Sequence, residues 1–236
     1  MFFNDGMPYP IKETEFRKLP VFIIAALMAS IAGYVNSAML IEFAMPVSQM
    51  TGIASRLSDA MFHSNLDYLL NACLVLFGFL FGAIISGLMI GQRQYRQDNA
   101  YGYALLCIGT LLSASALFSY IESTTSVLLA AIACGLQNAL IASYRGLQIR
   151  TTHMTGIVTD IGVYIAGFIK KRTPWNWQAY LLVVLFLSFI IGGIIGILAY
   201  QHFPNRAMIL PAVIMFILGF AYLKTNEHKP DIPISP

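Results

Sequence analysis

Long apolar runs separated by short polar segments are the main pattern of this chain. Six intervals carry no Asp, Glu, Lys or Arg, and each is long enough to be a membrane span, the last only just. A helix needs about 20 residues to cross about 30 Å of hydrocarbon, and irregular backbone cannot face lipid, so each interval predicts a transmembrane α-helix. The intervals are 19–41, 68–92, 99–121, 123–144, 173–205 and 207–223.

Two further segments do not fit a full span. Residues 44–65 contain a charge-free core of only about a dozen residues, followed by Arg56 and Asp59. Residues 151–169 form a longer stretch that Asp160 interrupts. Each segment is either a poor spanning helix or a re-entrant segment that enters and leaves the membrane on one side.

The distribution of basic residues decides between these arrangements, because Lys and Arg accumulate in cytoplasmic loops. If both short segments cross, nine basic residues lie inside and five outside; if only the second crosses, the split is eight to six. If neither crosses, twelve lie inside and only Arg56 and Arg206 lie outside. The sequence therefore predicts six spans and two non-crossing segments, with both termini in the cytoplasm.

Composition supports a membrane location. The 14 basic and 11 acidic residues make up 11% of the 236 positions, apolar residues make up 58%, and the mean hydropathy is +0.70. An ordinary soluble domain has about 25% charged residues, so this chain cannot cover a water-exposed surface. A soluble enzyme, a disulfide scaffold, a disordered chain and a nucleic-acid-binding module are all excluded, and the expected partner is the lipid bilayer.

The two halves of the chain contain similar motifs in the same order. Residues 33–37 (GYVNS) resemble 135–139 (GLQNA), and residues 50–55 (MTGIAS) resemble 154–159 (MTGIVT). Each half has three crossings, which is an odd number, so the second half is inserted upside down relative to the first. We therefore predict an all-α integral membrane protein with six transmembrane helices and two short re-entrant or half-helix segments, arranged as two inverted three-span repeats.

This arrangement divides the chain into four parts. The predicted boundaries are a cytoplasmic N-terminal segment (1–18), membrane repeat 1 (19–121), membrane repeat 2 (122–223) and a cytoplasmic C-terminal tail (224–236).

The two short segments are the predicted functional elements. Ser48, Thr51, Thr152 and Thr155 are suited to cap helices that start at this depth. Such a helix start presents unpaired N–H groups and the positive end of its dipole, and two of them would converge near the midplane. Many carriers bind a polar or anionic solute in this way. The alternative is that both segments are interfacial helices that seal the bundle.

Polar residues within the apolar runs complete the predicted site. In the segments, Thr51, Gly52, Thr155 and Gly156 would offer backbone and hydroxyl groups. Interhelical hydrogen bonding alone would also explain the amides, whereas Asp160 is expensive to bury and is a candidate for proton coupling. A pair with Arg56, which holds the equivalent place in the repeat, is one option for Asp160. The residues predicted to line the site are Asn36, Gln137, Asn138 and Asp160.

These features favour a small secondary transporter or facilitator of a polar or anionic solute. The alternative is a non-transporting assembly partner or sensor that acts through helix contacts. Its candidate surfaces are the pairs Gly78/Gly82 and Gly192/Gly196, which suit packing within the fold or across a homodimer. No catalytic motif, metal-ligand spacing or cofactor motif is present, so we expect neither an enzyme nor a cofactor.

The repeat motifs also resemble a known family. Residues 33–37, 50–52, 135–139 and 150–156 (RTTHMTG) are similar to those of the YoaK family of bacterial multi-pass membrane proteins, and the likeness runs from about Pro20 to Leu223. The resemblance implies a bacterial cytoplasmic-membrane protein with a transporter-like build, and it supplies no substrate. The sequence departs from the family pattern at Asn36, where an acidic residue is usual, and at Ile53, where Asn is usual.

Overall fold

The computed structural model describes residues 18–90, 99–121, 123–142, 151–171 and 174–226. Within these residues the chain forms eight helices and no strand. The predicted N-terminal segment, apart from Lys18, and the tail beyond Asn226 lie outside the described residues. The helices are α1 (Lys18–Phe43), α2 (Met50–Phe62), α3 (Leu66–Ile90), α4 (Ala100–Phe118), α5 (Ser123–Ala142), α6 (Met154–Ile169), α7 (Trp177–His202) and α8 (Ile209–Asn226).

Each predicted span corresponds to one of the six longer helices, α1, α3, α4, α5, α7 and α8. Five helices in the described ranges are long and apolar enough to cross a membrane, while the apolar part of α5, Thr124–Leu140, is somewhat shorter. The two segments predicted not to cross correspond to α2 and α6, which have 13 and 16 residues. The prediction of an all-α membrane protein is confirmed, whereas the four-part division stays a prediction.

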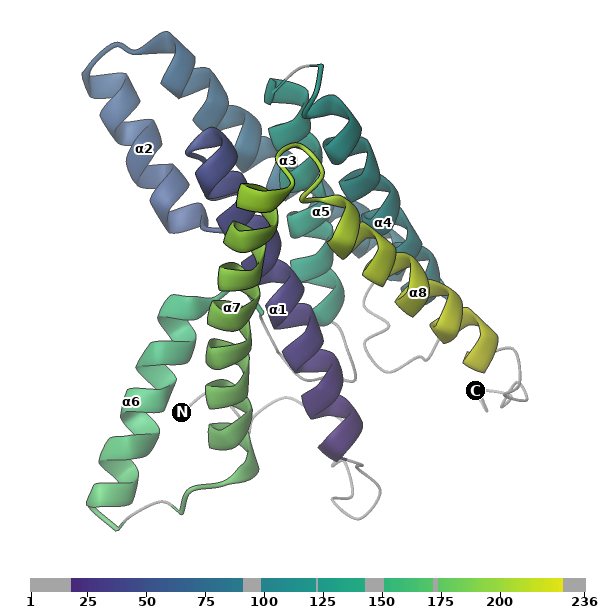
Figure 1. Cartoon of the computed structure of the whole chain (residues 1–236). Coiled ribbons are helices and arrows are strands. Elements are labelled where there is room, and N and C mark those ends of the chain that lie inside the picture. Colours follow the sequence, from purple (N-terminus) through teal and green to yellow (C-terminus); the bar gives the residue numbers. More distant parts are fainter. Residues whose placement is uncertain (1–17, 91–98, 122, 143–150, 172–173, 227–236) are drawn as a thin grey trace.

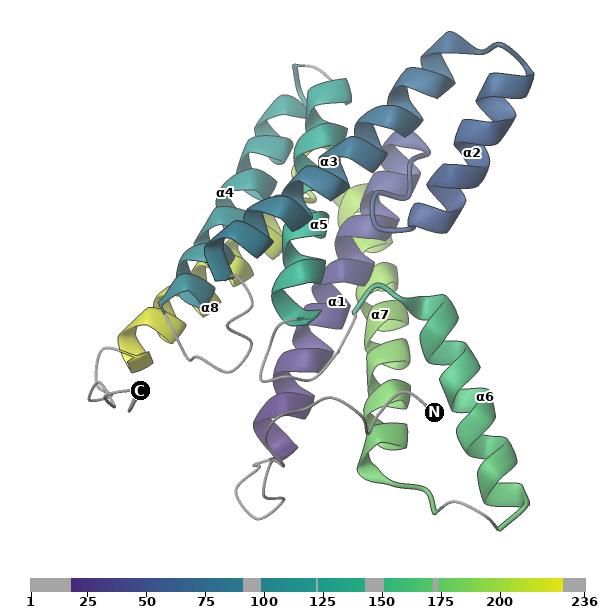
Figure 2. The ribbon, with the colours of Figure 1, turned by 180° about the vertical axis from the view of Figure 1, so that it is seen from behind.

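Four helices form the centre of the molecule, because α1 packs along α7, α3 packs along α5, and α1 contacts α5. Figures 1 and 2 show α2 and α6 on one side of this centre and α4 and α8 on the other. Helices α2 and α6 both begin near the middle of the molecule and run toward opposite ends. Each is followed by a turn and a long helix that returns past the middle.

Glycines allow the central helices to approach closely. A methyl group added at Gly33 would overlap the carbonyl oxygen of Phe189, and one added at Gly135 would overlap that of Phe79. Gly33 and Gly135 are 102 positions apart, and Phe79 and Phe189 are 110 positions apart. The α1–α7 and α5–α3 contacts are therefore built from equivalent residues.

A second pair of contacts has the same relation. Gly192 lies against the carbonyl of Ser30, and Gly82 lies against the carbonyl of Ile132. Again the α1 and α5 residues are 102 positions apart and the α3 and α7 residues are 110 apart. The motif similarity between the halves thus extends to how the helices pack.

Candidate functional site

The segments that lead into α2 and α6 are held by two asparagines on the central helices. Asn36 of α1 is 2% exposed, and its side-chain oxygen accepts hydrogen bonds from the backbone N–H (3.1 Å) and hydroxyl (2.9 Å) of Ser48. Asn138 of α5 accepts a bond from the hydroxyl of Thr152 at 2.8 Å. Each asparagine therefore fixes the residue two positions before its half-helix.

This geometry corrects the predicted capping. The residues at the N-cap positions are Gln49 for α2 and His153 for α6, and neither start has a side-chain cap. Ser48 and Thr152 do not cap, because each lies one residue before the N-cap position, where its hydroxyl donates to Asn36 or Asn138. Thr51 does not cap either: it lies inside the first turn of α2, one turn before Ser55, whose hydroxyl bonds to its carbonyl. Thr155 has the same place in α6.

The uncapped starts leave backbone donors available. The first helical hydrogen bond of α2 runs from the N–H of Ile53 to the carbonyl of Gln49. That of α6 runs from the N–H of Ile157 to the carbonyl of His153, and both measure 3.0 Å. Among the described residues, the N–H groups of Thr51, Gly52 and Thr155 have no hydrogen-bond partner. The start of a helix also carries the equivalent of about half a positive charge. Each start is thus a donor-rich, electropositive point.

A pocket of about 340 Å³ lies where the two starts meet. It is lined by residues 48–52 at the start of α2, by residues 152–155 at the start of α6, and by one residue each of α3 and α5. Among the described residues, no carboxylate lines it, and the imidazole of His153 is the single ionisable side chain of the lining. The lining residues are Ser48, Gln49, Met50, Thr51, Gly52, Phe79, Asn138, Thr152, His153, Met154 and Thr155.

The pocket brings together half of the residues predicted for the site. Thr51, Gly52, Asn138 and Thr155 line it, although they come from three helices and span more than 100 positions of the chain. Hydroxyl groups, backbone N–H groups and one amide therefore face a shared space. The binding role predicted for these residues stays a prediction.

The other four predicted residues lie elsewhere. Asn36 is buried behind Ser48, and Gln137 is buried with its amide donating to the carbonyl of Met28 at 2.9 Å, which links α5 to α1. Gly156 follows the pocket residues of α6, and Asp160 lies exposed one turn further along that helix. None of these four is a lining residue.

The option of an Arg56–Asp160 pair is not realised. The guanidinium Nη1 of Arg56 lies 4.0 Å from the sulfur of Met45. Within the described part of the chain, the single contact between a basic and an acidic side chain joins His63 Nδ1 and Asp59 Oδ1 at 3.1 Å, on the exposed end of α2. Asp160 therefore has no charged partner in this part of the structure.

The two half-helix starts differ in one respect. A methyl group added at Gly156 would overlap the imidazole ring of His153, whereas the nearest atom to one added at Gly52 is Oε1 of Gln49, at 3.9 Å. The α6 start is thus covered by its N-cap side chain, and the α2 start is open. The sequence patterns did not predict that Gln49, Phe79 or His153 would line the pocket.

The glycine pairs proposed as partner surfaces are used inside the fold. Added methyl groups at Gly78 and Gly82 would meet α5, and those at Gly192 and Gly196 would meet α1. In the described ranges, no group of three or more His, Cys, Asp or Glu side chains is placed to hold a metal ion.

Comparison with known sequences identifies the family. The model for a family described as "Protein of unknown function (DUF1275)" matches residues 24–221. The chain belongs to this family. A relative, the UPF0700 transmembrane protein YoaK of Bacillus subtilis (strain 168), is 26% identical over 191 residues, which cover 77% of this chain and 85% of that protein. The resemblance to the YoaK family is therefore confirmed, and the whole pocket lies within the DUF1275 match. No solved structure matches the chain.

Proposed function

We propose that this protein is a small secondary transporter or facilitator of a polar or anionic solute. Its location would be a bacterial cytoplasmic membrane, with both termini in the cytoplasm. The observation that carries the proposal is the meeting of two uncapped half-helix starts at one pocket. The proposal assigns no chemical reaction to the chain.

The equivalent contacts of the two halves support an inverted repeat as the basis of transport. Gly33–Phe189 and Gly135–Phe79 are equivalent pairs, and α2 and α6 run toward opposite ends. In carriers built from inverted repeats, the solute site lies between the repeats and one repeat rocks against the other. The pocket between the starts of α2 and α6 fits this position.

The pocket lining favours an anionic solute. The donors are the N–H groups of Thr51, Gly52 and Thr155 and the hydroxyls beside them, and two helix dipoles direct positive ends toward the space. Among the described residues, the lining has no carboxylate, so no anionic side chain there opposes the binding of an anion. A volume of about 340 Å³ is at the small end of the range for ligand pockets.

The test is solute flux in liposomes that contain the purified protein. Thr51→Asp and Thr155→Asp place a carboxylate in the first helical turn, where it stabilises the helix but repels an anion. Thr51→Asn and Thr155→Asn introduce a side chain of nearly the same shape as Asp but without its charge, so they are the matched controls. We expect flux of a small anion through the wild type and the Asn variants, and its loss in the Asp variants. No flux for any solute in a panel of anions and polar molecules would overturn the proposal.

Proton coupling is assigned to Asp160, which is exposed on α6 and has no charged partner among the described residues. Asp160→Asn should leave folding unchanged and abolish the dependence of uptake on a pH gradient. If Asp160→Asn transports with the same gradient dependence as the wild type, Asp160 has no part in coupling.

A further inference from the structure

The turns that connect α2 to α3 and α6 to α7 share one backbone form. The C-cap residues are His63 and Lys170, and each is followed by a residue with a left-handed backbone, Ser64 (φ 53°) and Lys171 (φ 52°). The hydrogen bonds also correspond, since Ser64 N donates to Met61 O at 3.4 Å and Lys171 N donates to Phe168 O at 3.0 Å. The chain thus contains two matched turns, at opposite ends of the molecule (Figure 1).

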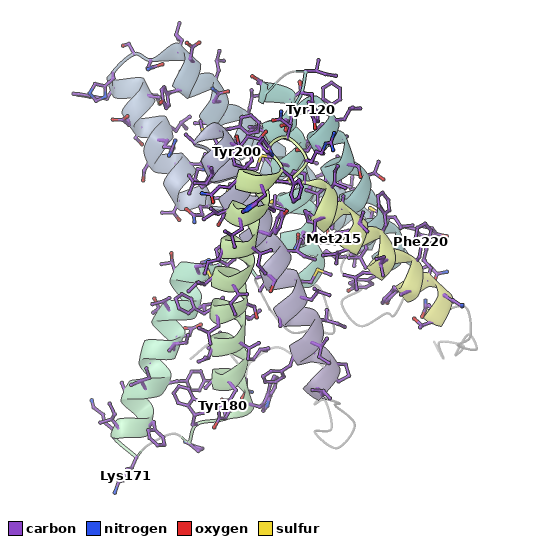
Figure 3. The ribbon with its side chains drawn as sticks, viewed as in Figure 1. Tyr120, Lys171, Tyr180, Tyr200, Met215 and Phe220 are labelled. Atoms are coloured by element: carbon purple, nitrogen blue, oxygen red, sulfur yellow. The ribbon has the colours of Figure 1, made fainter. Side chains whose placement is uncertain are left out.

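The two turns carry opposite charge. The α2–α3 turn has Asp59 and Asp67, and Asp59 is paired with His63. The α6–α7 turn has Lys170 and Lys171, both exposed, and neither has an acidic partner among the described residues. Figure 3 shows Lys171 at the end of the molecule, with its side chain directed away from the helices. Two adjacent ammonium groups are therefore free to bind an external anion.

Aromatic rings gather beside these lysines. The ring centroid of Trp175 lies 5.9 Å from that of Tyr180 and 6.4 Å from those of Tyr164 and Phe168. Phe168 and Tyr180 are more than half exposed. Rings with an apolar body and a polar tip prefer the headgroup zone of a bilayer. Rings at this level would place the two ammonium groups near the phosphates of the lipids.

We propose that this region, the α6–α7 corner, binds the headgroup of an anionic phospholipid. The corner consists of Lys170, Lys171, Trp175 and the three rings around it. The ammonium groups would hold the lipid phosphate, and the exposed rings would lie along the upper acyl chains. The acidic turn at the opposite end should show no such preference. Each lysine near an anionic surface is expected to enrich such lipids about fivefold.

The two tryptophans of the chain provide a direct readout, because Trp175 lies in this turn, Trp177 is the first residue of α7, and no other Trp is present. The experiment uses full-length protein in bilayers of phosphatidylcholine and phosphatidylglycerol at a fixed ratio. Bromine atoms on the acyl chains of one lipid at a time quench tryptophan fluorescence on contact. We expect brominated phosphatidylglycerol to quench more strongly than the same mole fraction of brominated phosphatidylcholine.

Variants separate this binding from general effects. Lys170→Gln combined with Lys171→Gln should remove the difference between the two lipids, and the matching double Arg variant should keep it. Lys224→Gln, which removes a cation from the last turn of α8, is the control and should also keep it. Equal quenching by both lipids in the wild type would overturn the proposal, as would an unchanged preference in the folded Gln variant. Loss of the preference on adding inorganic phosphate would instead indicate a site for free anions.

Discussion

Gly33 of α1 lies directly against the backbone carbonyl of Phe189 in α7, with no room for a methyl group between them. The equivalent glycine of the second half, Gly135 of α5, lies in the same way against Phe79 of α3. Helices in a membrane associate through such close packing of small residues, because lipid provides no hydrophobic force between them. These two contacts hold the four central helices together, and α2 and α6 pack against two of them, α3 and α7.

Gly33→Ala should strongly destabilise the protein. The overlapping atom is a backbone oxygen, which cannot move aside as a side chain can, so α1 and α7 must separate. Overpacking of this kind costs about 1–3 kcal/mol, and a rigid backbone neighbour favours the upper end. Thermal unfolding in detergent measures the loss, and Gly135→Ala should behave alike.

Gly162→Ala on α6 is the matched control, because no atom lies within 4 Å of the position of its added methyl group. Alanine is a better helix former than glycine by up to about 1 kcal/mol, so this variant should unfold at the same or a higher temperature. A Gly33→Ala protein as stable as the Gly162→Ala protein would contradict the packing described for α1 and α7.

Asn36→Ala should destabilise the fold more than Asn138→Ala does. Asn36 is buried and receives two hydrogen bonds from Ser48, so its removal leaves a buried N–H group and a hydroxyl without an acceptor. Leaving a buried donor unpaired costs about 1–3 kcal/mol. Asn138 is only half-buried and receives one hydroxyl bond, so solvent can replace it.

Ser48→Ala distinguishes the two donors to Asn36. This variant keeps the backbone N–H bond and loses only the hydroxyl bond, so it should be intermediate in chemical or thermal unfolding. Equal stabilities for the Asn36→Ala and Asn138→Ala proteins would mean that Asn36 does not fix the start of α2.

Residues 153 and 156 should be energetically coupled. The methyl group of Gly156→Ala must displace the imidazole of His153, and in a His153→Ala background there is no ring to displace. Neighbouring residues typically show coupling energies of about 0.5–3 kcal/mol in a double-mutant cycle. Gly52→Ala with Gln49→Ala is the control cycle at the equivalent place in α2, where the nearest atom is 3.9 Å away, and its coupling should be close to zero. Similar coupling in both cycles would show that the two starts do not differ.

Local patterns predicted the helices well, because a charge-free run and a helix in lipid obey the same constraint. The start of the run 68–92 and the start of helix α3 (Leu66–Ile90), for example, differ by two residues. The capping at Ser48 and Thr152 was predicted wrongly because α2 and α6 begin one residue later than a cap at these positions requires. No local pattern indicates that Phe79 of α3 reaches the pocket, since only the packing of α3 on α5 brings it there. The sequence motifs thus predicted polar groups of the pocket such as Thr51 and Thr155, but not Phe79, which packing between helices brings to it.

The six-span topology predicts that the two matched turns lie on opposite sides of the membrane. Single cysteines at Ser64 and Lys171, in a protein whose three native cysteines are replaced, place one thiol on each turn. The basic turn should be cytoplasmic, so a membrane-impermeant maleimide added to intact cells should label Ser64→Cys at once and Lys171→Cys only after permeabilisation. If α2 and α6 both crossed the membrane, both turns would face the cytoplasm, and neither cysteine would be labelled in intact cells. That result would remove the half-helix arrangement and, with it, the basis for a solute site between α2 and α6.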